Sequence, residues 1–134
     1  MRPIKWDKIL SVKVQIFDEE HQKLFSLYND LLEKKQVIDT KMLKPLLDSL
    51  ADYADYHFCN EEKYMQEYSY PDYEVHQRQH EYFSKKVKEF QRILREEKNL
   101  ELRNVSIFLR DWLIVHIQNS DRKYGDFFNK NGIY

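Results

Sequence analysis

Residues that interrupt helices are scarce in this chain: two glycines and three prolines in 134 residues leave few positions where a helix must end. The single cysteine, Cys59, excludes an internal disulfide. No run approaches the roughly 20 consecutive apolar residues of a membrane span. The chain has no large excess of either charge, since it contains 22 basic and 23 acidic residues. We therefore expect neither a nucleic-acid partner nor a membrane partner.

The N-terminal stretch MRPIKWDKIL lacks the apolar segment of a secretory signal, so we expect a cytoplasmic protein. The balanced surface charge and the lack of an apolar outer stripe favour a monomer.

Apolar residues recur every three to four positions in four stretches, which predicts helices at about 17–35, 42–68, 73–97 and 102–120. Breaks fall near 35–40, at 69–72 and near 97–101. Short connections make successive helices antiparallel neighbours. The sequence thus predicts an all-α, up-down-up-down four-helix bundle that forms one domain over 1–134. Residues 1–16 form an N-terminal arm that packs across the bundle, and 121–134 form a C-terminal segment.

The chain's histidines lie in the apolar seams of these predicted helices, where Leu or Ile would be usual. They are His21, His57, His76, His80 and His116. Glu61 follows His57 by four residues, so both project from one helix face, as do His76 and His80. A single seam histidine is most often a hydrogen-bonded core residue. Five of them with a carboxylate, spread over four helices, predict a buried metal site, because unpaired polar groups are costly to bury.

Asp121 follows His116 by five residues, which places it about 140° away on a regular helix. It reaches the same site only where the helix ends or widens into a π-type turn. Asn119 and Ser120, both unfavourable inside helices, are compatible with such a distortion. The alternative is that Asp121 caps the helix or pairs at the surface with a basic neighbour.

These seven side chains exceed the four ligands of a structural zinc site, and imidazole with carboxylate suits iron, copper, nickel or zinc. They fit a two-metal centre between four helices. Two octahedral ions offer twelve positions. Five imidazoles, two bridging carboxylates and one oxo or hydroxo bridge leave one position for a small diatomic such as O2. With only two carboxylates and no spare acid, base or nucleophile, we expect reversible ligand binding rather than an enzyme.

Three sequence segments then resemble the hemerythrin family, specifically its bacterial single-domain members. They are the first-helix stretch 17–24, the stretch 57–65 with the following Tyr-Pro and His76-x-x-x-His80, and the stretch 112–124. The resemblance covers about residues 6–128. Glu20 stands where Gln is frequent in this pattern, and Phe17 where Ile is common.

The resemblance implies a cofactor of two iron ions. His76, His80 and His116 would hold the iron with a filled coordination shell, and His21 and His57 the iron with the open position. Glu61 and Asp121 would bridge both. The resemblance also implies an O2 pocket walled by four apolar residues, which ordinary core packing would bury in any case: Leu24, Phe58, Leu113 and Ile117.

We therefore expect an O2-binding protein that acts as a carrier, a store or a local supply. One alternative is a sensor of O2, NO or iron that signals to a separate partner protein. A second alternative is a di-iron enzyme that consumes peroxide or NO, or donates iron for repair. A third alternative is non-physiological zinc bound by the same ligands.

Overall fold

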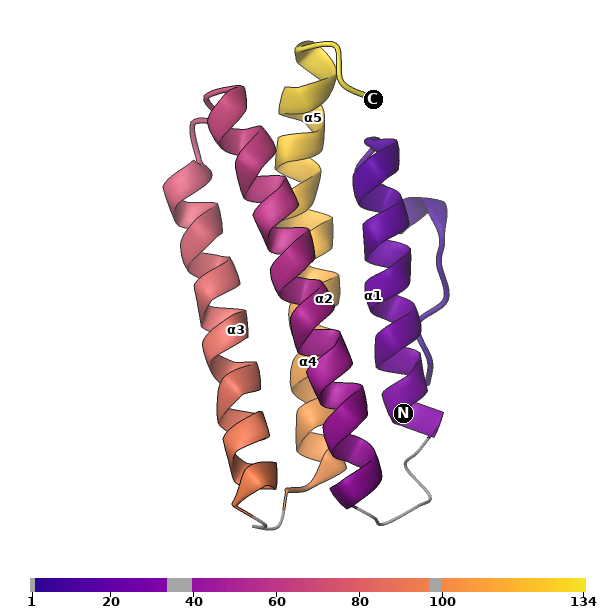
Figure 1. Cartoon of the computed structure of the whole chain (residues 1–134). Coiled ribbons are helices and arrows are strands. Elements are labelled where there is room, and N and C mark those ends of the chain that lie inside the picture. The colour runs from indigo at the N-terminus through magenta and orange to yellow at the C-terminus, as the bar shows by residue number, and fades with distance from the viewer. Residues whose placement is uncertain (1, 34–39, 97–99) are drawn as a thin grey trace.

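Four long helical rods lie side by side in the computed structural model, which describes residues 2–33, 40–96 and 100–134 (Figure 1). The elements in chain order are η1 (Lys8–Leu10), α1 (Gln15–Glu33), α2 (Thr40–Glu67), α3 (Tyr73–Arg95), α4 (Leu102–His116), η3 (Ile117–Asp121) and α5 (Arg122–Lys130). The described residues contain no strand. The antiparallel four-helix bundle predicted from the sequence is confirmed.

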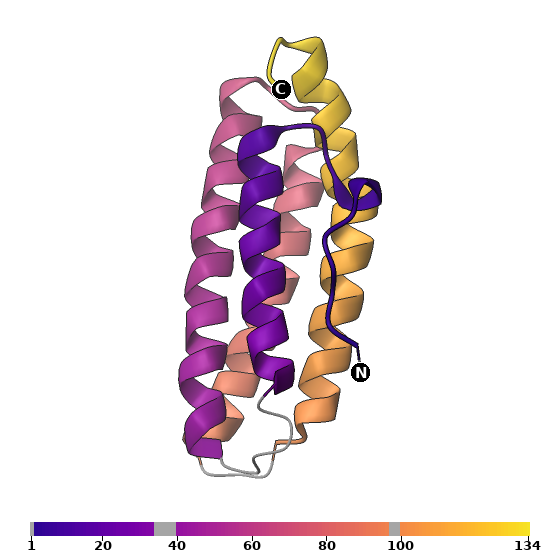
Figure 2. The same ribbon diagram turned by 90° about the vertical axis from the view of Figure 1, so that its right-hand side faces the viewer.

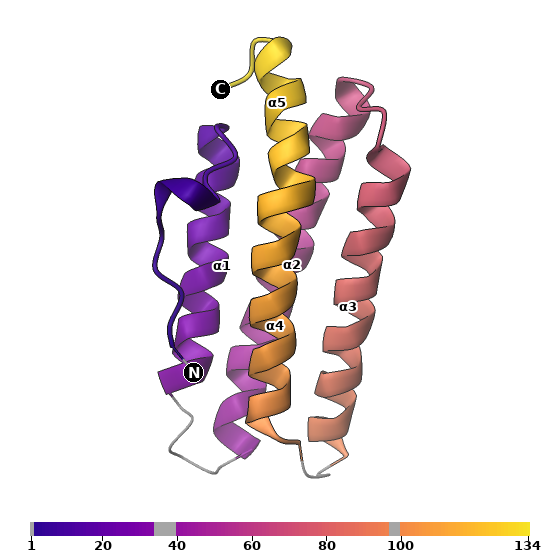
Figure 3. The same cartoon turned by 180° about the vertical axis from the view of Figure 1, so that it is seen from behind.

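The helix boundaries differ from the predicted ones mainly at the C-terminal end. The predicted breaks at 35–40 and 97–101 lie partly outside the described residues, as do the predicted helix ends at 35 and 97. The sequence predicts a helix end near 120, whereas the chain continues through the π-helical turn η3 into α5. In Figure 3, α4 and α5 form one continuous rod. The segment 121–134 is therefore mostly helix.

The core forms along the predicted apolar seams, because residues three and four apart share one helix face. On α1, Phe17, Leu24, Tyr28 and Leu31 are buried. Similar seams are buried on α3 and α4, among them Phe83, Val87, Phe90, Val105, Leu109 and Leu113. The polar side chains predicted for the metal site lie within these same seams.

The N-terminal arm runs along the bundle beside α1 and the α4–α5 rod (Figure 2). Its apolar side chains Ile4, Leu10, Val12 and Val14 are buried. Trp6 packs against Phe25 of α1, with ring centroids 6.1 Å apart. The arm thus packs on the bundle as the sequence predicts.

Polar side chains of the bundle bind the backbone of the arm. Asn29 of α1 accepts from the N–H of Ile4 (2.8 Å) and donates to the carbonyl of the same residue (2.9 Å). Arg110 of α4 donates to the carbonyl of Arg2 (2.6 Å). Asn129 of α5 donates to the carbonyl of Lys13 (3.0 Å). These bonds satisfy backbone groups of a segment that forms little secondary structure of its own.

Gly125 of α5 lies where the backbone of the arm passes close to the bundle. A Cβ atom at this position would stand 2.0 Å from the carbonyl oxygen of Val12, which is backbone and not a movable side chain. In a free helix, alanine is favoured over glycine by about 1 kcal/mol. Here the contact reverses that preference, because the arm must move for a methyl group to fit.

We predict that Gly125→Ala lowers the free energy of unfolding by about 1–3 kcal/mol, the usual cost of overpacking. Asp126→Ala is the matched control, because Asp126 is exposed on the same helix and should change little. Urea titrations followed by circular dichroism measure both. A Gly125→Ala protein more stable than the parent would contradict the close approach of arm and helix.

Candidate metal centre

All seven side chains predicted as metal ligands lie inside the bundle, and none is more than 5% exposed. They come from every rod: His21 from α1, His57 and Glu61 from α2, His76 and His80 from α3, and His116 and Asp121 from α4 and η3. Their ligand atoms form two groups, within each of which all atoms lie within 4.8 Å of one another. One group holds His76, His80 and His116, the other holds His21 and His57, and both include Glu61 and Asp121.

Glu61 directs one carboxylate oxygen to each group. Its Oε2 lies 3.3 Å from Nε2 of His21 and 3.1 Å from Nε2 of His57. Its Oε1 lies 3.2 Å from Nε2 of His80. The carboxylate therefore spans the boundary between the two-histidine and the three-histidine group.

Asp121 makes the same division from the opposite side of the bundle. Its Oδ2 lies 3.1 Å from Nε2 of His21. Its Oδ1 lies 2.9 Å from Nε2 of His76 and 3.0 Å from Nε2 of His116. Asp121 is only 1% exposed, so the surface pairing considered for it is wrong.

The π-helical turn η3 is what brings Asp121 inward. A π-turn adds one residue to a helical turn, so a side chain five positions after His116 returns to the same face. Asn119 donates to the carbonyl of Val115 (2.7 Å), and Ser120 donates to Gln79 of α3 (2.6 Å). These two residues use their polar side chains to stabilise the distortion.

Several buried polar atoms at the centre lack a hydrogen-bond partner among the described residues. They include His21 Nδ1, Glu61 Oε1, His76 Nε2 and both carboxylate oxygens of Asp121. Each such atom costs about 1–3 kcal/mol, and more where it is charged. All but His21 Nδ1 belong to the two donor groups, where a cation would bind them. The residues present therefore fit a pair of metal ions held by nitrogen and oxygen donors.

Both central carboxylates are ionised at neutral pH. Burial raises the pKa of Glu61, but the charge of His57 and the close imidazole nitrogens of His21, His57 and His80 hold it well below its usual value. Burial and the charge of Glu61 raise the pKa of Asp121, yet His116 and His21 bring it well below the ordinary value. The centre therefore carries two negative charges that cations must balance.

In the metal-free protein, protonated imidazoles supply part of that balance. Burial lowers the pKa of His57, but the charge of Glu61 and hydrogen bonds with Glu20 and Glu61 outweigh it and raise the pKa to about 10. The pKa is also raised at His21 and His80, where hydrogen bonds with carboxylates outweigh burial. At His116, burial outweighs the charge of Asp121 and lowers the pKa. A metal ion thus competes with protons for these nitrogens.

We predict that the metal-free protein loses stability as the pH rises from 6.5 to 9. The pKa of His57 is about 10 in the folded chain and 6.5 in the unfolded chain, so its stabilising contribution is complete below 6.5 and is lost as the pH rises toward 10. The loss is at most about 1.4 kcal/mol per pH unit. Denaturant titrations at several pH values measure it. Metal-loaded protein is the control, and equal pH dependence of both forms would contradict the prediction.

Aromatic side chains enclose the centre at both ends. Toward α5, Phe17 packs edge-on against Tyr64 (5.1 Å) and Tyr124 (5.3 Å). Toward the other end, Phe58 stacks on His80 with ring centroids 3.9 Å apart and planes 9° apart, and Trp112 stacks on His116 at 4.2 Å. These contacts fix the orientation of two imidazoles and keep the centre dry.

The four residues that the resemblance implies as O2-pocket walls are all buried: Leu24, Phe58, Leu113 and Ile117. Of these, Phe58 lies against an imidazole of each group, stacked on His80 and 5.8 Å from His57. Ordinary core packing also buries such residues, so their role as pocket walls stays a prediction.

Three residues that contact the predicted ligands are not among the site residues predicted from the sequence. Glu20 accepts from Nδ1 of His57, Glu62 accepts from Nδ1 of His80, and the Tyr124 hydroxyl donates to Glu61. Burial and the nearby carboxylates raise the pKa of Tyr124 well above its usual value, so it keeps its proton. Glu20 and Glu62 each directly adjoin a predicted ligand in the sequence, and Glu20 also stands where Gln is frequent in the resembled pattern.

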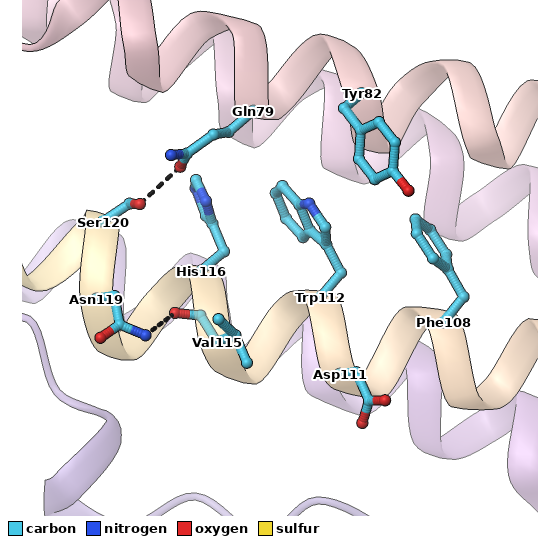
Figure 4. A pocket seen from close by; sticks show the side chains of 9 residues that line it. All are labelled: Gln79, Tyr82, Phe108, Asp111, Trp112, Val115, His116, Asn119 and Ser120. Atoms are coloured by element: carbon cyan, nitrogen blue, oxygen red, sulfur yellow. Dashed lines mark hydrogen bonds between the residues drawn. The ribbon is translucent and has the colours of Figure 1, made fainter.

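A groove of about 630 Å³ lies between α3 and α4, and one predicted ligand, His116, is among the residues that line it (Figure 4). Tyr82, Phe108 and Trp112 line one end, and the hydrogen bond from Ser120 to Gln79 crosses the other. His116 lies on its wall, beside the stacked ring of Trp112. The three-histidine group therefore comes close to the surface along this groove.

An all-α bundle with buried imidazole and carboxylate groups shared between four helices defines a helical metal-binding protein. The sequence profile of the hemerythrin HHE cation binding domain matches residues 12–128. The chain belongs to this family.

Two relatives and one solved structure are similar to this chain over almost its whole length. A bacteriohemerythrin of Stenotrophomonas maltophilia is 29% identical and covers 94% of this chain and 82% of its own length. A myohemerythrin of Theromyzon tessulatum is 30% identical, with 91% of each chain covered. The crystal structure of a wild-type hemerythrin superposes with a TM-score of 0.89 at 26% identity, covering 93% of this chain and 97% of that one.

Proposed function

We propose that this chain binds O2 reversibly at two iron ions, as an oxygen carrier, store or local supply. The observation that carries the proposal is the pair of overlapping donor groups, one with three imidazoles and one with two, which share Glu61 and Asp121. Membership of the hemerythrin family supports iron as the metal, and so does a donor set of imidazoles and carboxylates.

In this proposal His76, His80 and His116 hold one iron and His21 and His57 hold the other. Glu61 and Asp121 would be shared by the two irons, since each has one oxygen directed to each group. The iron pair, when bound, supplies the electrons with which O2 is held and released. The two-histidine group has fewer protein ligands, so we assign O2 binding to that side.

The surrounding side chains keep water and free protons away from bound O2. We propose Leu24, Phe58, Leu113 and Ile117 as the walls of the O2 pocket, since all four are buried. Tyr124 holds its proton on the hydroxyl that bonds Glu61, because its pKa lies well above the usual value. Exclusion of water protects the centre from irreversible oxidation.

We propose binding rather than catalysis because each of the three buried carboxylates among the described residues is already in contact with an imidazole. Glu61 and Asp121 lie between imidazoles of both groups, and Glu20 is held by His57 and Asn60. No helix in the described ranges is long and apolar enough to cross a membrane. A monomeric state, a cytoplasmic location and NO as a second ligand stay predictions.

We predict reversible oxygenation with two irons per chain. Metal-free protein is loaded with ferrous iron under argon, air is admitted, and the visible spectrum is recorded before and after the O2 is stripped again. A charge-transfer band should appear with air and disappear under argon over repeated cycles. Rapid one-way conversion to an oxidised form would contradict the carrier proposal, and repeated turnover with a reductant and peroxide or NO would favour an enzyme.

Glu61→Gln gives the matched negative control for this experiment. The change keeps the shape of the side chain but removes the charge on which three imidazoles converge, so iron content and the oxygenation band should both fall. Glu67→Gln alters an exposed carboxylate on the same helix and should leave both unchanged. Equal iron content in the two variants would contradict the bridging role of Glu61.

A further inference from the structure

Glu20 contacts an imidazole of the two-histidine group from outside. Its Oε1 lies 2.6 Å from Nδ1 of His57, while Nε2 on the other side of that ring lies 3.1 Å from Glu61. The ring thus stands between an outer and a central carboxylate. Because Nδ1 keeps its proton and donates it in a hydrogen bond to Glu20, Nε2 is the nitrogen left to bind a metal.

Both oxygens of Glu20 are occupied by partners from α2. Oε2 accepts from Nδ2 of Asn60 at 2.9 Å, three residues after His57 on the same helix. Glu20 itself is only 7% exposed. Hydrogen bonds to both oxygens fix the orientation of this carboxylate. Because it is shielded from water, its charge is screened less than that of a carboxylate in a surface ion pair.

The surroundings of Nδ1 in His21 and His80 differ from those in His57. Nδ1 of His21, in the same group, is buried without a hydrogen-bond partner among the residues that the structure describes. His80, in the three-histidine group, contacts Glu62 at 2.9 Å, but that carboxylate is 20% exposed. Of the two carboxylate–imidazole contacts, the shorter and more buried one therefore belongs to the two-histidine group, to which we assign O2 binding.

We propose that Glu20 is a positioning residue that sets the reduction potential of the iron held by His57. This inference rests on the proposed function. Its negative charge makes the imidazole a stronger donor, which stabilises ferric iron more than ferrous iron and so lowers the potential. Glu20 thereby sets how readily the iron of the two-histidine group gives electrons to O2. It also sets how readily that iron is irreversibly oxidised.

Glu20→Gln tests the inference, because it keeps the side-chain shape and an acceptor oxygen and removes only the charge. Iron content should stay at the parent value. The reduction potential should rise by at least 59 mV, which corresponds to a tenfold change in relative ferric and ferrous affinity for a one-electron couple. Affinity for zinc, which has no redox chemistry, should fall roughly 10- to 100-fold. Potentiometric titration and calorimetry give the two values.

Two further variants separate the effect of a carboxylate bonded to the His57 imidazole from the effect of the protein's net charge. Glu62→Gln removes the more exposed partner of His80 and should shift the potential less than Glu20→Gln. The double variant Glu20→Gln, Asn60→Asp keeps the net charge and the side-chain pairing, but moves the carboxylate off the imidazole. It should behave like Glu20→Gln, and it also serves if the single variant does not fold.

Unchanged potential and zinc affinity in Glu20→Gln, with normal iron content, would overturn the role of Glu20 and leave the proposed function standing. So would a double variant that returns to the parent potential, because net charge alone would then explain the effect. A parent protein that takes up no iron would overturn the proposed function and this inference with it.

Discussion

Two ionised carboxylates in a dry helical core are the constraint on which the rest of this structure depends. Glu61 and Asp121 are at most 1% exposed, and removal of such charges from water costs several kcal/mol per ion unless cations meet them. Five imidazoles surround the pair, and in the absence of metal three of them, His21, His57 and His80, take up protons that balance part of its charge. Protons balance part of the charge, but Asp121 and Oε1 of Glu61 contact the imidazoles without favourable hydrogen-bond geometry. A pair of metal ions would satisfy both requirements.

The fold arranges its other parts around this constraint. Each carboxylate directs one oxygen to either donor group, which needs α2 and the π-turn η3 to face each other across the bundle. Aromatic layers close both ends, and Phe58 and Trp112 hold imidazoles by stacking. Glu20 and Glu62 fix the rings of His57 and His80 by hydrogen bonds at Nδ1, on the side of each ring away from the centre. The unequal division of imidazoles, three and two, distinguishes the two sides.

Helical spacing made much of this arrangement predictable from the sequence. His57 with Glu61, and His76 with His80, share a face wherever a helix forms, so the bundle and most of the donor set follow from periodicity. Asp121 was harder, because its position depends on a π-turn that spacing permits but does not require. The contacts of Glu20 and Tyr124 join separate elements and depend on side-chain rotamers, so no local pattern predicts them. The helical conformation of α5 was missed because a distorted turn precedes it without ending the rod.

Anomalous diffraction at the iron edge from crystals of the iron-loaded protein tests the central claim most directly. The account predicts two iron peaks, one bound by His76, His80 and His116 and the other by His21 and His57, with Glu61 and Asp121 contacting both. A single peak, or two peaks that share neither carboxylate, would contradict it.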